Sequence, residues 1–340
     1  MRRSTTRQVL LLCALAALAV VTSACANEAA PQDVLSPSGQ FAREADRLWD
    51  IVFPIAVVIF FIVEGLLLYA LFRFRRKPGR EARQFHGNTR LEIVLTALPA
   101  LILAGVAVPT VQTIFSQAEE PAGALQVEVE GRQFWWRFEY PELGVVTANE
   151  LHIPVGQPVR LTIRGFDVIH SFWVPRLAGT IDVVPGRVNH LTIQADEPGE
   201  YWGQCKEFCG LSHGNMRLRV IAQSEQDFLA WVSDQQLDAQ PPSGAAAQRG
   251  LELFQQTCTS CHAVAGLPNT PADDRGLVGP NLTHFSSRRT FAGALLENND
   301  ANLRAWLDNP PAIKPGSVMP DYNLTPEQID DLIAYLRTLE

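Results

Sequence analysis

Hydrophobic residues dominate the first third of the chain, where they form three runs at positions 9–21, 51–72 and 91–115. The second and third runs are long enough to cross a bilayer, because a membrane helix needs about 20 apolar residues. The first run is shorter, follows Arg2 and Arg3, and ends in the small residues Ser23 and Ala24. That pattern is typical of a secretory leader. A third membrane helix is the alternative interpretation of this run.

The segment between the two long runs is strongly basic. Its cationic residues are Arg73, Arg75, Arg76, Lys77, Arg80, Arg83 and Arg90. Because basic loops stay in the cytoplasm, the mature N-terminus and everything after Ser116 are predicted to lie outside it. Residues 1–24 are thus a predicted signal peptide, 25–48 an extracytoplasmic segment, and 49–116 a two-helix transmembrane hairpin. The leader ends in Val-Thr-Ser-Ala-Cys25, which resembles a bacterial lipoprotein cleavage box, so lipidation of Cys25 stays open.

Beyond position 122 apolar and polar residues alternate. Alternation at a period of two is typical of strands that bury one face. The alternating stretches are Leu125–Glu130, Val159–Arg164, Val188–Gln194 and Met216–Ala222, with turns rich in Pro and Gly between them. An all-β sandwich or barrel is therefore predicted over 122–223.

Helical patterns replace the alternation toward the C-terminus. A helix over Glu225–Leu237 is followed by a Pro, Ser, Gly and Ala stretch typical of a linker, where we place a hinge. Residues 247–340 predict a small all-α domain, whose last helix begins with Thr325 as N-cap and Pro326 in the first helical position. The fold class is thus multidomain, with a helix and linker at 224–246 between two soluble domains.

Two thiols, an imidazole and a thioether are clustered in one short segment, at Cys205, Cys209, His213 and Met216, and His170 precedes them at a strand end. Soft sulfur together with imidazole favours copper. Two neighbouring thiolates can bridge two coppers, each completed by one histidine, with Met216 and a backbone carbonyl as weaker ligands. The competing interpretation is a Cys205–Cys209 disulfide, which an oxidising compartment would permit.

A second cofactor signature stands at Cys258-Thr-Ser-Cys261-His262. Two thiols one helical turn apart attach haem covalently, and the following histidine ligates the iron. A redox-active dithiol is the alternative. With Cys13 in the leader and Cys25 as the possible lipid site, no thiol is left over for a disulfide.

The copper ligands and their spacing resemble subunit 2 of cytochrome c oxidase. The similar segments are Asp167-Val-Ile-His170-Ser-Phe-Trp-Val-Pro175, Cys205-Lys-Glu207-Phe-Cys209-Gly-Leu-Ser-His213-Gly-Asn-Met216 and Leu91-Glu92-Ile-Val-Leu-Thr-Ala-Leu-Pro99. The resemblance implies a cupredoxin-like Greek-key barrel that holds the binuclear copper centre CuA. It also implies that Glu207 lends its backbone carbonyl to copper and its side chain to a magnesium ion at the border with subunit 1.

The same resemblance assigns two further positions. Glu92 matches a glutamate at the mouth of a proton path into subunit 1, with a solvated carboxylate at a helix end as the alternative. Phe134 stands where the family usually has a tryptophan at which electrons arrive, and Leu95 replaces another usual tryptophan. Phe134 is thus a candidate to lie between the donor and the coppers, whereas Trp136 is expected to pack within a strand.

The C-terminal domain is similar to class I cytochromes c, through Gly279-Pro-Asn-Leu and Ser317-Val-Met319-Pro. This resemblance implies that Met319 is the second axial ligand, opposite His262, and such ligation raises the haem potential. A haem domain on a short tether would have a high effective concentration at the copper domain. The expected order of electron flow is external donor, haem c, CuA and then subunit 1.

Together these features predict the subunit through which electrons enter a respiratory haem-copper cytochrome c oxidase, which reduces oxygen to water and translocates protons. The small subunit of a CuA-containing nitric oxide reductase is the alternative, and a copper-storage or assembly factor is disfavoured by the haem. A quinol oxidase subunit would share the helices and barrel but lack Cys205 and Cys209.

The expected surroundings are a bacterial plasma membrane with its lipid, subunits 1 and 3, and an upstream quinol–cytochrome c reductase or cytochrome c donor. The 340 residues, 47% of them hydrophobic, suffice for several cores. Acidic side chains outnumber basic ones after Gln248 and the net charge is −8, so no nucleic-acid partner is expected. The acidic haem domain predicts a donor contact unlike the lysine patches of soluble cytochromes.

Overall fold

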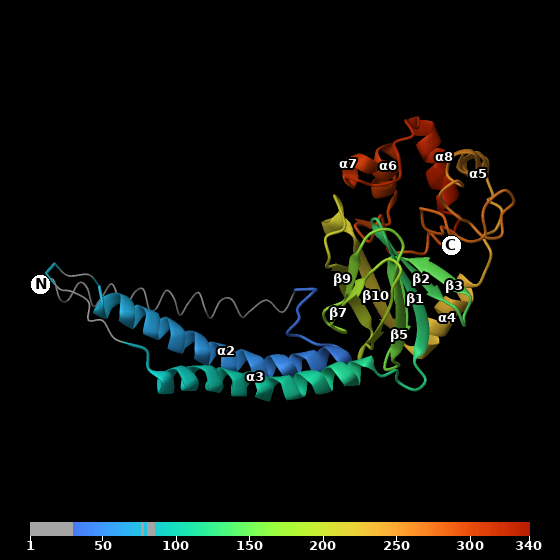
Figure 1. The fold of residues 1–340 in the computed structure, drawn as a ribbon. Coiled ribbons are helices and arrows are strands. Elements are labelled where there is room, and N and C mark those ends of the chain that lie inside the picture. The colour runs from blue at the N-terminus through green and yellow to red at the C-terminus, as the bar shows by residue number, and fades with distance from the viewer. Residues whose placement is uncertain (1–29, 76–77, 80–85) are drawn as a thin grey trace, which may run out of the picture.

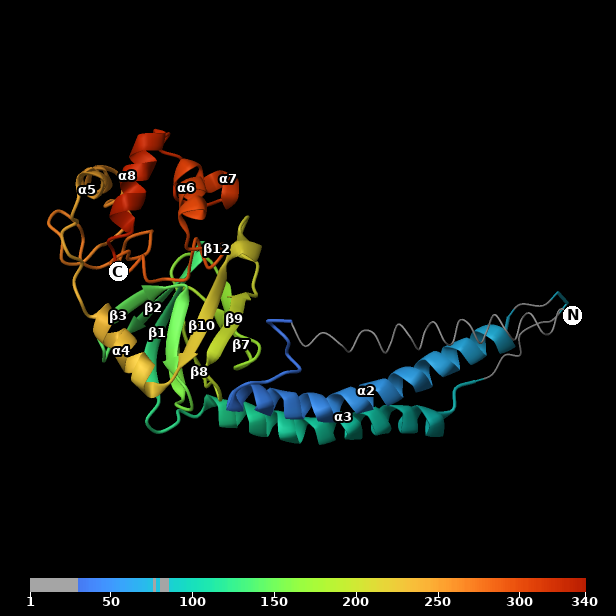
Figure 2. The same cartoon turned by 180° about the vertical axis from the view of Figure 1, so that it is seen from behind.

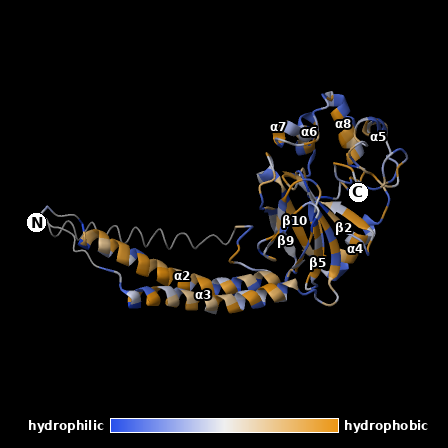
Figure 3. Cartoon of the chain, viewed as in Figure 1, coloured by the Kyte–Doolittle hydropathy of each residue, from blue (hydrophilic) through white to orange (hydrophobic). Residues whose placement is uncertain are grey.

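The computed structural model describes residues 30–75, 78–79 and 86–340 (Figure 1). The predicted signal peptide and Cys25 lie outside the described residues. Two long helices, α2 (Gln40–Arg73) and α3 (Thr89–Ala118), run side by side away from the rest of the chain (Figures 1 and 2). Both are long and apolar enough to cross a membrane, and their apolar windows are exposed. Hydrophobic colour dominates their middle parts, as expected for lipid-facing surfaces, whereas hydrophilic colour appears near the β domain (Figure 3).

Helix α2 begins before the predicted hairpin, which we had started at Trp49. Its first turn packs against the β domain, where Phe41 and Ala42 are buried. Arg43 in the same turn makes an ion pair with Asp196. The base of the hairpin is therefore attached to the soluble part by both apolar and charged contacts.

The β domain is a sandwich of two five-stranded sheets. The first sheet has the order β3 (Val145–Ala148), β2 (Trp135–Tyr140), β1 (Leu125–Arg132), β5 (Val159–Gly165) and β8 (Val188–Ile193). The second has the order β4 (Glu150–Pro154), β10 (Arg217–Gln223), β9 (Gly199–Cys205), β6 (His170–Trp173) and β7 (Thr180–Val183). Strand β1 pairs in parallel with β5, Leu125 opposite Val159, and antiparallel with β2.

The core of the sandwich is aromatic. Trp136, Phe138, Tyr140 and Phe172 are all fully buried between the sheets. The Trp136 and Phe172 rings meet edge to face with centroids 5.3 Å apart. Burial of each such ring contributes about 1.5–3 kcal/mol. Trp136 therefore packs within the core of the sandwich, as expected from the sequence.

Helix α4 (Glu225–Gln235) closes one edge of the sandwich. Ser224 caps it by accepting a hydrogen bond from the Asp227 backbone N–H. Its apolar face buries Phe228 and Val232, and Trp231 stacks on His152 with ring centroids 4.1 Å apart. The amphipathic pattern of this segment thus serves to cover the β domain.

The C-terminal domain contains the helices α5 (Ala245–Thr257), α6 (Asp300–Asp308), α7 (Pro310–Ile313) and α8 (Pro326–Leu336), with a two-stranded ribbon of β11 (Thr290–Phe291) and β12 (Leu296–Glu297). Helix α8 starts with the predicted Thr325 cap, completed as a capping box by Gln328. Gly250 in α5 lies so close to α8 that a Cβ there would stand 2.0 Å from the Asp331 carbonyl oxygen. The predicted multidomain class, with membrane hairpin, all-β domain and helical domain, is confirmed.

The segment predicted to contain a hinge is anchored at two points. Ala239 is buried in the core of the helical domain, and its backbone N–H donates to the Ala265 carbonyl at 3.1 Å. Pro242 is also buried, whereas most of the other residues of the segment are exposed, and the helical domain rests directly on the β sandwich (Figures 1 and 2). A Pro, Ser, Gly and Ala composition is compatible with a packed connection as well as a free one, so the hinge stays a prediction.

Candidate functional site

The predicted copper ligands converge at one end of the β domain. His170 opens β6 and Cys205 closes β9, two strands that pair antiparallel. The loop after β9 supplies Cys209, and the short 3-10 helix η1 (His213–Asn215) supplies His213 before Met216. Pairing of β6 with β9 thus brings together residues that are far apart in the sequence.

The donor atoms lie close to one another. The Cys205 and Cys209 sulfurs are 3.8 Å apart, and His170 Nδ1 lies 3.9 Å from Cys205 Sγ. On the other side, His213 Nδ1 is 3.7 Å and Met216 Sδ 3.9 Å from Cys209 Sγ. The cluster is therefore built symmetrically around the two sulfurs, with one imidazole beside each.

Asp167 orients one of the two imidazoles. Its carboxylate lies 2.8 Å from His170 Nε2, which leaves Nδ1 directed at Cys205. Carboxylates that hold the second nitrogen of a ligating histidine are a common feature of metal sites. The sequence analysis did not single out Asp167, although its place three residues before His170 was a usable signal.

The pKa values of the two thiols are shifted in opposite directions. The contact between the two sulfurs, with further hydrogen bonds, lowers the pKa of Cys205 to about 4. The same contact and burial raise the pKa of Cys209. Metal binding to this pair would release the protons of both thiols, because thiolates are the ligands.

The residues present fit a pair of copper ions. Two thiolates, two imidazoles and a thioether form a soft donor set, and the Glu207 carbonyl oxygen lies 3.2 Å from Cys205 Sγ. The side chains of His170, Cys205, Cys209 and Met216 are buried, whereas that of Glu207 is exposed. Both cysteines are free thiols in this structure, so the disulfide interpretation gains no support.

The predicted haem ligands line one large cavity in the C-terminal domain. Cys258, Cys261, His262 and Met319 all face it, and it encloses about 1180 Å³ of space, including the part open to solvent. Its remaining walls are mostly apolar, as expected for a cofactor site. Arg288 also lines it, is buried, and has an Nε without a hydrogen-bond partner among the described residues. Its Nη2 donates to the Asn281 carbonyl at 2.6 Å, so the free Nε–H is the group that suits a haem carboxylate.

His262 is held in a defined orientation. Its Nδ1 lies 2.9 Å from the Pro280 carbonyl oxygen, and burial lowers the pKa of His262, so the ring is neutral. The ring packs against Gly279, where a Cβ would stand 2.6 Å from it. A neutral imidazole with Nδ1 occupied presents Nε2 to a metal.

The cavity has a wall that sequence reasoning missed, because it comes from the other domain. Gln133, Phe134, Trp135 and Asn149 of the β domain line it together with Lys314 of the helical domain. These contacts join segments that are distant along the chain, so no local sequence pattern could predict them.

Phe134 lies between the two candidate sites. Its ring lines the haem cavity and also packs on Gly210, where a Cβ would stand 3.1 Å from the ring. The neighbouring Gln133 donates from Nε2 to the Cys209 carbonyl at 2.6 Å. Phe134 and Gln133 thus lie between the copper loop and the haem cavity and contact both.

Glu92 stands apart from both sites. It lies in the first turn of α3, which is capped by Asn88, and its side chain is exposed at the far end of the hairpin. Glu92 therefore belongs to neither the copper cluster nor the haem cavity.

Three family models match the chain. They are described as cytochrome C oxidase subunit II, transmembrane domain, over residues 29–113, cytochrome C oxidase subunit II, periplasmic domain, over 144–223, and cytochrome c, over 247–340. Between them they span most of the chain, including all the predicted ligands.

Curated relatives cover nearly the same length. Cytochrome c oxidase subunit 2 of Alkalihalophilus pseudofirmus is 38% identical over 318 residues, covering 91% of this chain and 90% of that protein. The protein of the same name from Bacillus subtilis is 32% identical, covering 90% and 91%. Quinol oxidase subunit 2 of Bacillus spizizenii is 33% identical, with coverages of 68% and 73%.

Proposed function

The chain belongs to the cytochrome c oxidase subunit II family, and from that membership we propose which of its side chains carry electrons. Its homologues and its fused cytochrome c domain make it the subunit through which electrons enter a haem-copper oxidase, with subunit 1 as its partner. The family implies CuA copper, and the fused domain implies haem c. The two apolar helices and the periplasmic domain describe a membrane protein with an extracytoplasmic part.

For the copper pair, the proposed ligands are His170, Cys205, Glu207, Cys209, His213 and Met216. Cys205 and Cys209 would hold both ions, and His170 and His213 would each contribute one imidazole nitrogen. What supports this assignment is the pair of free sulfurs 3.8 Å apart with an imidazole nitrogen beside each. Burial of the sulfurs keeps water out and holds the ligands in place.

For the haem, Cys258 and Cys261 would attach the group covalently, and His262 and Met319 would supply the ligands to its iron. The bound cofactors supply one-electron redox chemistry, and the protein supplies their positions and surroundings. Pro280 fixes His262, the apolar walls exclude water, and Phe134 fills the space between the cavity and the copper loop. The observation that carries the proposal is this single ring shared by both sites.

Several finer assignments belong to the same proposal. The exposed Glu207 carboxylate would bind magnesium at the contact with subunit 1, because its remaining ligands must come from another chain. Glu92 would receive protons at the mouth of a path into subunit 1. The complex would also contain subunit 3, lie in a bacterial plasma membrane, and draw electrons from a quinol–cytochrome c reductase or a cytochrome c.

The deciding test is oxygen uptake by the purified complex with a reduced artificial donor and no added soluble cytochrome. We expect rapid uptake that falls at least about 100-fold in Cys205→Ser, since one bridging thiolate is then missing. The matched control is Ser171→Ala, which changes a hydroxyl beside the same site but no ligand. Nitric oxide consumption without oxygen uptake would instead assign the chain to a reductase.

A further inference from the structure

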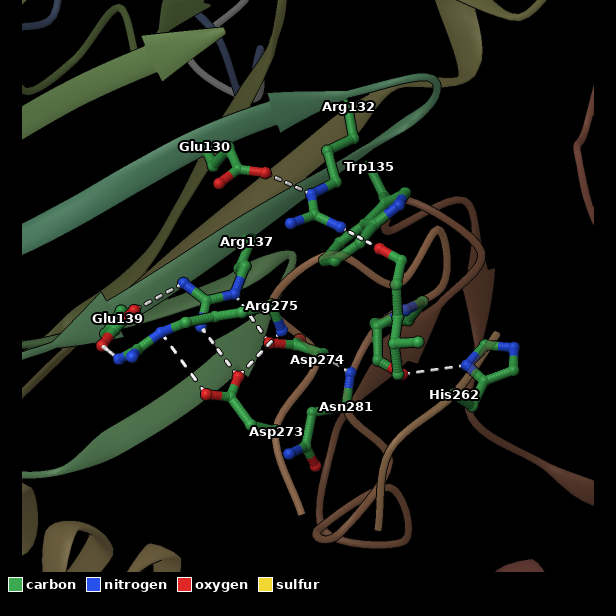
Figure 4. A network of polar contacts seen from close by, with 12 residues as sticks. Glu130, Arg132, Trp135, Arg137, Glu139, His262, Asp273, Asp274, Arg275 and Asn281 are labelled. Carbon is green, nitrogen blue, oxygen red and sulfur yellow. Dashed lines mark hydrogen bonds and ion pairs between the residues drawn. The ribbon is translucent and has the colours of Figure 1, made fainter. Parts of the chain in front are cut away.

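Side chains of the β domain bond to one stretch of the haem domain, residues 273–281 (Figure 4). Arg132 donates to the Leu277 carbonyl, and Trp135 Nε1 donates to the Val278 carbonyl at 3.1 Å. Arg137 Nε donates to Asp274 Oδ1 at 2.7 Å. We propose that Arg137, although it belongs to the copper domain, is a positioning residue for the haem and acts through Asp274 on the orientation of His262.

The link between Asp274 and His262 is a single peptide unit. Asp274 Oδ2 accepts a hydrogen bond from the Asn281 backbone N–H at 3.0 Å. The carbonyl of that same unit belongs to Pro280 and lies 2.9 Å from His262 Nδ1. In a planar trans peptide the N–H and C=O point in opposite directions. A carboxylate that holds one side therefore aims the other at the imidazole, as the close-up shows (Figure 4).

The pair that anchors this peptide is charged and buried. The side chains of Arg137 and Asp274 are 4% and 1% exposed. Burial lowers the pKa of Arg137, but Asp274 and Glu139 raise it further, so the guanidinium stays charged. Charge-assisted bonds of this kind are strong and directional in a water-poor interior. Arg137 thus fixes Asp274 across the domain boundary.

The arrangement acts on the electronic character of the imidazole as well as its direction. A carboxylate on the peptide N–H polarises the unit and makes the Pro280 carbonyl a better acceptor. A stronger acceptor at Nδ1 increases the electron density that His262 offers through Nε2. The oxidised haem is then favoured relative to the reduced one. This inference rests on the proposed function, because it takes His262 as the axial ligand.

The test is the midpoint potential of haem c in the purified complex, measured by redox titration of its visible spectrum. In Asp274→Asn we expect a higher potential, with up to about a tenfold change in the oxidised-to-reduced ratio, equivalent to about 59 mV. In Arg137→Met we expect a lower potential, because Asp274 then faces the peptide without a counter-charge. Shifts of the same sign in both variants would contradict the proposal.

Matched controls distinguish the effect of the hydrogen-bonded network on the haem potential from the effect of charge alone. Asp273→Asn and Arg275→Gln make the same charge changes beside the network, at side chains that are 50% and 68% exposed. We expect each to shift the potential by less than a third as much as its partner variant. Equal shifts in Asp273→Asn and Asp274→Asn would overturn the proposal, because simple Coulomb attraction would then account for both.

A further variant covers the case in which a lone buried charge prevents folding. The double variant Arg137→Met with Asp274→Asn leaves no unpaired ion in the interface. Its net charge is unchanged, so a raised haem potential would report loss of the hydrogen bond from the carboxylate to the peptide. An unchanged potential would refute the proposed role of Asp274. Absence of covalent haem from the wild-type chain would instead be a failure of the proposed function.

Discussion

Lys314 is the most unusual single residue of the haem cavity, because a lysine is rarely buried without an acidic partner. Its Nζ donates to the Phe134 carbonyl at 2.6 Å and to the Ala292 carbonyl at 2.7 Å, one in each domain. Its side chain lies in a mostly apolar wall. Lys314 thus joins the two domains at the residue that separates the two cofactor sites.

Burial gives Lys314 a predicted effect on stability. It lowers the pKa of Lys314 from its usual 10.5 to about 7. The folded state therefore loses this proton at lower pH than the unfolded chain, so the free energy of unfolding rises with pH between about 7 and 10.5, by up to about 1.4 kcal/mol per pH unit. In Lys314→Met this rise should disappear.

The measurement is denaturant unfolding of the haem domain at a series of pH values, followed by visible absorbance. Lys206→Met is the control, since that lysine is exposed and its Nζ lies 4.6 Å from the Trp173 ring centroid. An unchanged slope in Lys314→Met would show that another group titrates in this range.

At the residue scale, the sequence indicated which residues could bind cofactors better than it indicated which residues surround them. Cysteine and histidine spacing indicated both clusters because ligands close in sequence are held close in space. Lys314 and Arg137 gave no such signal, because what distinguishes them is burial against another domain. Nothing in the sequence distinguishes a lysine or arginine that is exposed to solvent from one that is buried.

At the scale of elements, the contact between α5 and α8 depends on one missing side chain. A Cβ at Gly250 would stand 2.0 Å from the Asp331 carbonyl oxygen and 2.7 Å from Tyr335 Cβ. We expect Gly250→Ala to force these helices apart and destabilise the haem domain by about 1–3 kcal/mol. Thermal unfolding monitored through the haem absorbance would measure the loss.

Gly179→Ala is the appropriate comparison, because a Cβ there meets nothing within 4 Å. It should leave the unfolding temperature nearly unchanged. Equal changes in unfolding temperature in the two variants would mean that Gly250 is not needed for the close approach of α5 to α8.

Some elements could be predicted because each has a clear period or cap. Alternation located β1, β5, β8 and β10, and the caps located α8. The early start of α2 could not be predicted, because its first turn lies outside the long apolar run and is held by contacts with the β domain.

At the scale of the whole molecule, the haem domain is docked through contacts that are spread over its surface. Glu150 of the β domain is buried and accepts bonds from the Thr290 backbone and hydroxyl, each at 2.7 Å. Ser212 donates to the Pro315 carbonyl at 2.6 Å. Together with the Arg137 and Lys314 contacts, these bonds fix the distance between the two candidate sites.

A docked domain predicts electron transfer that does not depend on ionic strength. Salt between about 0.01 and 1 M shortens the screening length from about 30 to 3 Å, yet it hardly reaches buried pairs. We expect the internal transfer rate, measured after rapid photoreduction of haem c, to change by less than about twofold over this range. Reduction of the complex by an added cationic cytochrome should slow with salt and serves as the control.

A tenfold or larger fall of the internal rate with salt would mean that the domain leaves its place and returns. That behaviour would match the tether expected from composition. The sequence could not show whether the haem domain is docked or tethered, because the linker composition does not indicate whether Ala239 is buried. Their packing is decided by the surface of the domain that follows.

The shared charges also limit how such a protein can change by recombination. Exchange of the cytochrome domain at the linker for one without an acid in place of Asp274 would leave Arg137 with Glu139 as its remaining buried partner. The charged hydrogen bond to the haem domain would be lost, at a cost of about 1.5–3 kcal/mol. The two domains must therefore be inherited as a matched set, although each has its own fold and its own cofactor. A functional chimera would need the β1–β2 side chains from the same ancestor as the haem domain.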